Sequence, residues 1–173
     1  SLFAGTSTDK KPVALQSCSG KSATRQVFDF LESVAPAGGS TIDTTVASTL
    51  RVHRGRGIAI VLSDFLTTGD VSRSFNLLNS TGLEIFALQI LGPNEIEPNV
   101  TGDIRLVDCE TGQALDVSSA RDLLDLYHEH RQTQQDWLAS QCRRRNGRFE
   151  SVSSGNSLES ILFKTLLRRG WVR

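Results

Sequence analysis

The chain alternates short, continuous apolar runs with segments whose apolar residues recur every three or four positions. The runs Gly57 to Leu62 and Leu83 to Leu91 contain few polar residues, which is typical of strands buried on both faces of a parallel sheet. Helical spacing of apolar residues occurs in Ser22 to Val34 and in Thr41 to Val52. This alternation predicts a doubly wound, Rossmann-like α/β fold with a mostly parallel sheet and helices on both of its faces.

The remaining pattern predicts the connections and the end elements. Asp70 has the position of an N-cap for a helix that ends near Leu78. A long helix begins after Ser118 or Ser119 and ends at Asn146-Gly147. The other expected elements are two edge strands or a hairpin at Ser1 to Ala4 and Pro12 to Leu15, an inserted antiparallel hairpin at Ile104 to Val107 and Ala114 to Val117, a strand at Arg148 to Val152 and a helix at Ser157 to Leu167. With 173 residues and no repeats or linker, the chain predicts a single domain.

Charge and cysteine content narrow the class of protein. The 19 basic and 19 acidic residues balance, so no global charge favours nucleic acid or an anionic membrane. The longest apolar runs are too short to span a bilayer. The three cysteines, Cys18, Cys109 and Cys142, show no C-x-x-C spacing, which favours a reducing cytosol over a disulfide framework. We therefore expect a cytoplasmic location.

Two polar clusters occur where open parallel sheets bind ligands. The strand Ile58 to Leu62 is followed by Ser63-Asp64-Phe65, which places the Asp64 carboxylate at the carboxyl end of a central strand. At the start of the second helix, the hydroxyl of Ser40 or Thr41 can face a metal ion as well as cap the helix. Hydroxyls and a carboxylate without His or Cys predict a hard oxygen site that suits Mg²⁺ or Mn²⁺. The structural alternative is that Asp64 caps the following loop and a hydroxyl caps the helix.

The Gly-Gly-Ser-Thr helix start, followed by a strand ending in Leu-Ser-Asp-Phe, resembles the second and third parts of the metal-ion-dependent adhesion site (MIDAS) of von Willebrand factor type A domains. More specifically, the chain is similar to the bacterial family called domain of unknown function 58. Leu91 to Pro98, Arg105 to Gly112 and Tyr127 in the long helix add to the likeness, which covers nearly the whole chain.

The resemblance implies a function and a set of ligands. Asp64, with Thr41 or Ser40, would line a Mg²⁺ or Mn²⁺ site with a position open to a partner's carboxylate. Gly-Gly-x-Thr spacing favours Thr41, whereas a helix register that buries Ile42 and Val46 favours Ser40. The implied role is a non-catalytic adaptor in protein-protein interaction, working with a MoxR-type AAA+ ATPase or its client.

One part of the family pattern is missing. The first metal motif, D-x-S-x-S, is absent, because no Asp precedes the serines of Cys18 to Ser22. The resemblance then implies that the first strand and its helix lie upstream of Ser1, in keeping with the absence of methionine. We expect an incomplete site with poor metal affinity in this chain.

Two other functions stay open as alternatives. Gly20-Lys21-Ser22 before a helix resembles the end of a phosphate-binding loop, and Asp64 would then assist Mg²⁺ in a nucleotide hydrolase. The complete loop needs a glycine where this chain has Leu15. The other alternative is a purely structural scaffold domain.

A histidine pair and a basic cluster are two further candidate sites. His128 and His130 are two residues apart on a helix, so they point in different directions and cannot share one metal. The basic cluster around Arg143 to Arg148 predicts favourable charge at a helix end or, alternatively, a surface for an acidic partner.

Overall fold

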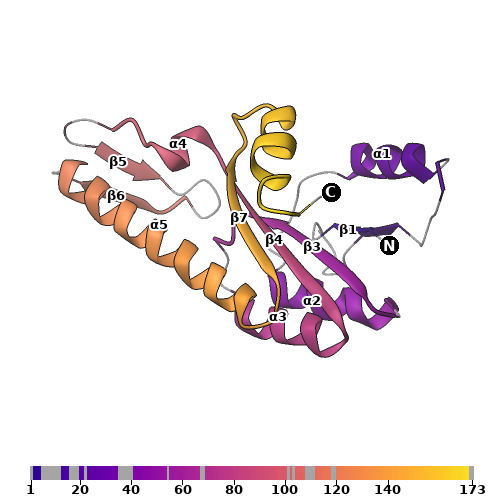
Figure 1. Ribbon diagram of the computed structural model, residues 1–173. Coiled ribbons are helices and arrows are strands. Elements are labelled where there is room, and N and C mark those ends of the chain that lie inside the picture. Colours follow the sequence, from indigo (N-terminus) through magenta and orange to yellow (C-terminus); the bar gives the residue numbers. More distant parts are fainter. Residues whose placement is uncertain are drawn as a thin grey trace.

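A parallel sheet of three strands forms the centre of the computed structural model. The strands are β3 (Gly57–Ser63), β4 (Leu83–Leu91) and β7 (Arg148–Ser153), in the order β3-β4-β7 (Figure 1). β4 lies in the middle and is almost entirely buried. The structure describes residues 2–4, 13–15, 20–21, 23–34, 41–53, 55–66, 69–100, 102, 104–107, 112–117 and 120–171.

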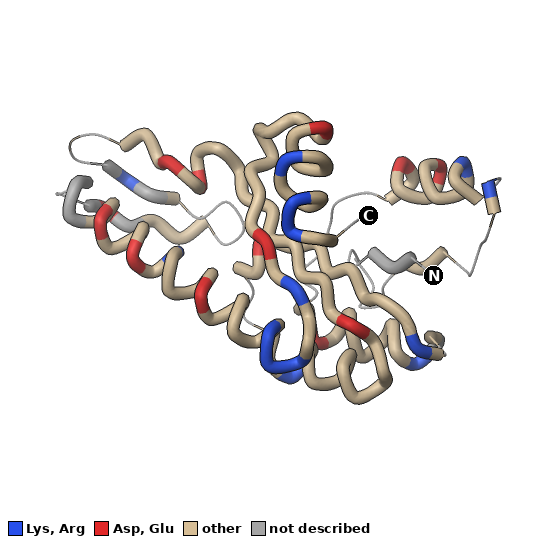
Figure 2. Tube along the Cα trace, in the orientation of Figure 1, with Lys and Arg blue, Asp and Glu red and all other residues tan. Residues whose placement is uncertain are grey.

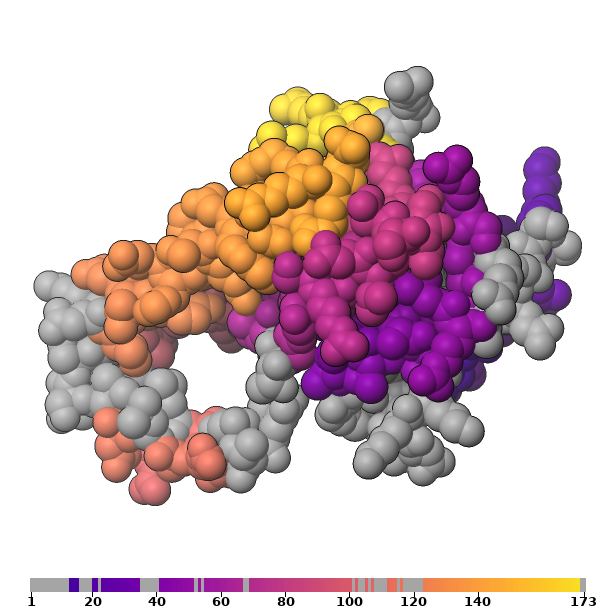
Figure 3. All heavy atoms as spheres, turned by 90° about the horizontal axis from the view of Figure 1, so that it is seen from below, coloured from indigo at the N-terminus to yellow at the C-terminus, as the bar shows by residue number. Residues whose placement is uncertain are grey.

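Helices cover both faces of this sheet. On one face, α2 (Ile42–Val52), α3 (Val71–Ser80) and α5 (Ala120–Arg143) enclose a core that includes the fully buried Phe75, Ile85 and Leu138. Figure 3 shows α2 and α3 packed side by side over this region. On the other face, the C-terminal helix η1 (Ser160–Leu166) packs Leu166 against Leu88 and Val152. The prediction of a mixed α/β fold with a parallel sheet, consistent with a Rossmann-like arrangement, is confirmed.

Local signals fix the helix ends. The Asp70 side chain accepts a hydrogen bond of 2.8 Å from the backbone N–H of Arg73 and so caps α3, as predicted. After α5, Asn146 adopts a left-handed φ of 56° and the N–H of Gly147 donates to the carbonyl of Cys142 at 2.8 Å. The predicted stop at Asn146-Gly147 is therefore confirmed.

The expectation that β3 is a central strand buried on both faces is wrong within the described residues. β3 is an outer strand there, and Ile58, Ile60 and Leu62 are 57%, 66% and 60% exposed. Ala59 and Val61 point to the opposite face, where they pack against the core. The apolar run specifies a strand and its preference for burial, but it does not specify which part of a protein covers the second face.

Two antiparallel hairpins lie at the periphery. β1 (Leu2–Ala4) pairs with β2 (Val13–Leu15), and β5 (Ile104–Val107) pairs with β6 (Ala114–Val117), both at the predicted positions. α1 (Ala23–Ser33) lies apart from the sheet (Figure 1). The short helix α4 (Pro93–Ile96) was not predicted, and η1 differs in type from the predicted α-helix because its N–H groups bond five residues back, as from Leu167 to Leu162 at 2.9 Å. Among the described helices, none is both long and apolar enough to cross a membrane.

Candidate metal-binding site

Asp64 lies in a tight turn at the carboxyl end of β3. The next residue, Phe65, has a left-handed φ of 59° and is 3% exposed, because its ring packs in the core at 6.2 Å from the ring of Phe75. One Asp64 carboxylate oxygen, Oδ1, accepts a 2.9 Å hydrogen bond from the N–H of Leu66. No described residue donates to the second oxygen, and the residue is exposed. The predicted loop-capping role is therefore real, and among the described residues it uses one oxygen of the carboxylate.

A network of glutamines fixes the backbone of this turn. The amide of Gln89, which is fully buried in β4, donates to the carbonyl of Asp64 at 2.9 Å. Gln134 of α5 donates to the carbonyl of Phe65 at 3.0 Å. The side-chain amide of Gln135 donates to the side-chain oxygen of Gln89 at 3.1 Å and to the Ser151 hydroxyl at 3.0 Å. The network thus joins the Asp64 turn to β4, α5 and β7. Sequence analysis missed it, because lone glutamines in a strand and a helix follow no recognisable spacing.

Thr41 stands at the N-cap position of α2, but its side chain makes no capping hydrogen bond. Its hydroxyl instead lies against the hydroxyl of Thr44 in a short hydrogen bond. The alternative that Thr41 serves to cap the helix is therefore not what the structure shows. Ser40 lies outside the described residues, so the choice between Ser40 and Thr41 stays open.

Asp43 is a further carboxylate at the start of α2. The hydrogen bond from the Thr41 hydroxyl lowers the pKa of the Asp43 carboxyl below its usual value. Burial raises this pKa by less, and the positive charge of Arg73 in α3 lowers it further. The Oδ1 atom of Asp43 is buried, and no described residue donates a hydrogen bond to it. Buried acceptors are normally paired, so an ionised carboxylate with an unpaired oxygen is a fitting ligand for a cation. Sequence analysis did not single out Asp43.

The start of α2 and the end of β3 approach the same part of the core, since Ile42 packs against the cluster that contains Phe65. No hydrogen bond joins Thr41 to Asp64. The oxygen donors of Asp64, Asp43 and Thr41 fit a hard divalent cation in chemical type. They are few in number: among the described residues, no three His, Cys, Asp or Glu side chains are grouped to hold a metal.

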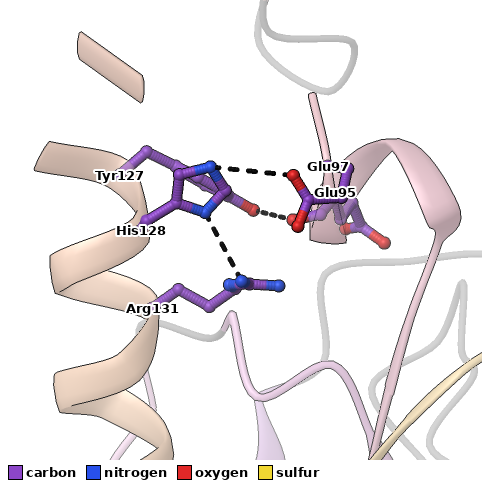
Figure 4. Close-up of polar contacts among 5 residues, drawn as sticks. All are labelled: Glu95, Glu97, Tyr127, His128 and Arg131. Atoms are coloured by element: carbon purple, nitrogen blue, oxygen red, sulfur yellow. Dashed lines mark hydrogen bonds and ion pairs between the residues drawn. The ribbon is translucent and has the colours of Figure 1, made fainter. Parts of the chain in front are cut away.

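His128 belongs to a separate polar cluster between α5 and α4 (Figure 4). The Tyr127 hydroxyl donates to the carbonyl of Glu95, His128 Nε2 lies 4.0 Å from a Glu97 carboxylate oxygen, and Arg131 contacts His128 Nδ1 at 3.4 Å. These contacts tie α5 to α4, and His130 takes no part in them. That the two histidines do not share a metal stays a prediction.

The remaining predicted positions are those of the phosphate-loop candidate and the cysteines. Gly20 has a left-handed φ of 83° and Lys21 is exposed, whereas Ser22 lies outside the described residues. Cys142 is fully buried, and burial raises the pKa of its thiol to about 12. Cys18 and Cys109 fall outside the described residues.

Comparison with known proteins adds a family and several relatives. A family model described as "Protein of unknown function DUF58" matches residues 5–136. An uncharacterized protein of Mycobacterium avium is 33% identical over 79 residues, which cover 45% of this chain and 46% of the relative. An uncharacterized protein of Mycobacterium tuberculosis is 31% identical over 85 residues, which cover 49% of this chain and 26% of the relative. The chain thus spans less than half the length of these curated relatives.

Two solved structures resemble the chain only loosely. The conserved hypothetical protein BatB of Bacteroides thetaiotaomicron shares 14% identity at a TM-score of 0.44, covering 86% of this chain and 70% of BatB. An aerotolerance-related membrane protein of Bacteroides fragilis shares 18% identity at a TM-score of 0.45, covering 83% and 69%.

Proposed function

Because the chain belongs to the family of proteins of unknown function DUF58, and because Asp64 stands at the carboxyl end of a parallel strand, where α/β folds commonly bind ligands, we propose that it is a non-catalytic protein-interaction module. In this proposal a divalent cation, Mg²⁺ or Mn²⁺, binds beside Asp64 with Thr41 or Ser40. A bound cation of this kind can hold a carboxylate from a partner protein in an open coordination position.

The exposed position of Asp64 is the observation that carries the proposal. The carboxylate is presented at the carboxyl end of a parallel strand, where α/β folds commonly bind ligands. The buried side-chain amide of Gln89 donates to the backbone carbonyl of Asp64 at 2.9 Å, so the backbone that carries the carboxylate is fixed. The unpaired Oδ1 of Asp43, beside Thr41, supplies a second reason to expect a cation here.

The partner in this proposal is a MoxR-type AAA+ ATPase or a client of that ATPase, and the setting is the cytosol. This part rests on the family resemblance, since no surface formed by the described residues specifies an ATPase. The competing functions are a scaffold without metal-regulated binding and a nucleotide hydrolase that uses Gly20, Lys21 and Asp64.

Metal binding can be tested by titrating the protein expressed from its complete natural gene with Mn²⁺, followed by electron paramagnetic resonance. Asp64→Asn keeps the shape of the side chain and removes its charge, so we expect affinity to fall by about tenfold or more. Asp43→Asn should weaken binding in the same direction. The control is Asp125→Asn, an exposed carboxylate on α5, which should bind as the wild type does. Equal affinity of the Asp64→Asn and Asp125→Asn variants would refute the site.

Partner capture separates the three functions. The adaptor requires capture of an ATPase or its client that chelator abolishes and that Asp64→Asn loses. Capture that chelator leaves unchanged supports the scaffold. Nucleotide turnover by the purified protein, with no ATPase present, supports the hydrolase and contradicts the adaptor.

A further inference from the structure

A cleft lies at the end of the sheet opposite to Asp64. The strands are parallel, so the start of β7 and the end of β3 are at opposite ends. The cleft has a volume of about 280 Å³ and is bounded by the last turn of α5, the first residues of β7 and the segment after η1. Phe149 packs in the core under α5, whereas Trp171 packs in the core under η1, at 5.0 Å from the ring of Phe86. The cleft therefore runs past the outer edge of β7 between the two helical layers.

The cleft is lined by more basic than acidic side chains. They present the guanidinium groups of Arg143, Arg148 and Arg169 and a single carboxylate, that of Glu150. Arg169 lies 3.2 Å from Glu150, and Arg148 lies 3.9 Å from Glu84. Arg143 is exposed and has no carboxylate partner among the described residues. Figure 2 shows the basic residues at the end of α5, at the start of β7 and along the C-terminal helix.

Arg145, the third arginine at the end of α5, does not belong to this surface. It donates to the side chain of Asn76 in α3 at 2.7 Å and to the carbonyl of Gln141, so it ties α5 to α3. Of the basic cluster predicted from the sequence, Arg145 thus has a structural role, Arg143 and Arg148 line the cleft, and Arg144 is exposed outside it.

The outer edge of β7 enters the cleft at Phe149 and continues past it to Ser151, and this edge can accept another strand. Within the described part of the chain, β7 pairs only with β4. The N–H of Ser154 donates to the carbonyl of Leu91 at 2.8 Å. Since backbone groups alternate in direction along a strand, those of Phe149 and Ser151 point away from β4. Their donors and acceptors face outward, in the spacing that an added extended chain requires.

We propose that this cleft binds an acidic, extended peptide segment, which adds to the outer edge of β7 as a further strand. Backbone hydrogen bonds to Phe149 and Ser151 supply the register, and acidic side chains of the peptide pair with Arg143 and Arg169. Charged residues beside an open edge deter pairing with apolar or basic strands. The charge of the cleft therefore selects the acidic occupant. This site uses no metal ion and is distinct from the Asp64 site.

The probe for this proposal is a fluorescein-labelled peptide, Glu-Val-Glu-Thr-Glu-Val-Glu-Thr, followed by fluorescence anisotropy at low salt. We expect saturable binding that weakens steeply in about 0.5 M NaCl, because screening reduces exposed charge pairs. Replacing every Glu of the peptide with Lys should abolish binding. The protein variant Arg143→Glu should weaken binding by about tenfold or more. Its control is Arg51→Glu, which changes net charge equally on the exposed surface of α2 and should cost less than about twofold.

Backbone pairing is tested with two peptides of the same sequence, N-methylated at odd or at even positions. Only one set of amides faces the protein in an added strand, so one isomer should lose binding and the other should keep it. Equal affinity of the two isomers overturns strand addition. Equal weakening by Arg143→Glu and Arg51→Glu overturns the location, and tighter binding of a single-stranded DNA of matched charge overturns the assignment to a peptide.

Discussion

Replacement of Gln89 by leucine should destabilise the protein strongly, although leucine is apolar and of similar size. Gln89 is fully buried, donates to the Asp64 carbonyl at 2.9 Å and accepts from Gln135 at 3.1 Å. Leucine can neither donate to the Asp64 carbonyl nor accept from the Gln135 amide. A buried donor or acceptor that loses its partner costs about 1–3 kcal/mol. Gln135 keeps its hydrogen bond to Ser151 and is only half-buried, so its lost bond to residue 89 should cost less free energy than the one lost at the Asp64 carbonyl. We expect a loss of about 2–4 kcal/mol in the free energy of unfolding.

That loss is a large part of the total stability of a typical domain, which is about 5–15 kcal/mol. In urea it corresponds to a midpoint shift of roughly 1–2 M, for an m-value of roughly 2 kcal/mol/M. Urea unfolding followed by circular dichroism measures this shift, with the m-value checked for each variant. The matched control is Gln132→Leu on the exposed side of α5, where the amide bonds only to Asp136 at 3.2 Å. It should change stability by about 0.5 kcal/mol or less.

The reasoning would be refuted if Gln89→Leu were as stable as the wild type. That result would mean that burial of leucine compensates fully for the lost network, and the glutamines would then not fix the Asp64 turn. A loss of stability as large in the control as in Gln89→Leu would also contradict it, because the effect would then come from helix or surface properties.

Four further predictions follow from local geometry. Gly147→Ala should cost about 2 kcal/mol or more in urea unfolding, because an added Cβ would lie 2.6 Å from the carbonyl oxygen of Ile85. Asp70→Ala should cost about 1 kcal/mol by the same assay, through loss of the cap on α3. Cys142, with its pKa raised to about 12 by burial, should react with a thiol reagent at pH 8 only after unfolding. Because the pKa of Asp43 is lowered in the folded state, its ionised carboxylate stabilises the fold at pH values above the ordinary carboxyl range. This contribution is lost as pH falls through the folded-state pKa, so Asp43→Asn should make the free energy of unfolding less dependent on acid pH.

Features that depend on neighbouring residues were predictable from the sequence. The hairpin of β5 and β6 and the cap at Asp70 stand where the pattern placed them, because turn and capping chemistry acts over a few residues. The parallel strands were also found, since an unbroken apolar run has few other uses in a short segment.

Features that depend on packing between distant segments were not predictable. Gln89 reads as a polar interruption in an apolar strand, and only the fold brings it to the carbonyl of Asp64 and to Gln135. The buried Oδ1 of Asp43, to which no described residue donates, is likewise a feature that only the folded chain shows. For the candidate metal site, Asp64 with Thr41 or Ser40 stays a prediction of the sequence, which gave no sign of the glutamine network or of Asp43.

The two outer strands of the sheet explain why reversible binding is assigned to β7 and not to β3. β3 carries no charged residue from Gly57 to Ser63 and exposes the apolar side chains of Ile58, Ile60 and Leu62. An apolar edge of that kind pairs indiscriminately and is suited to permanent burial. β7 begins with Arg148 and places Glu150 two residues later, so its edge is compatible with water when no ligand is bound. Selectivity requires an edge that rejects most strands. The charged residues on β7 provide that rejection, and Arg143 and Arg169 beside it attract an acidic strand.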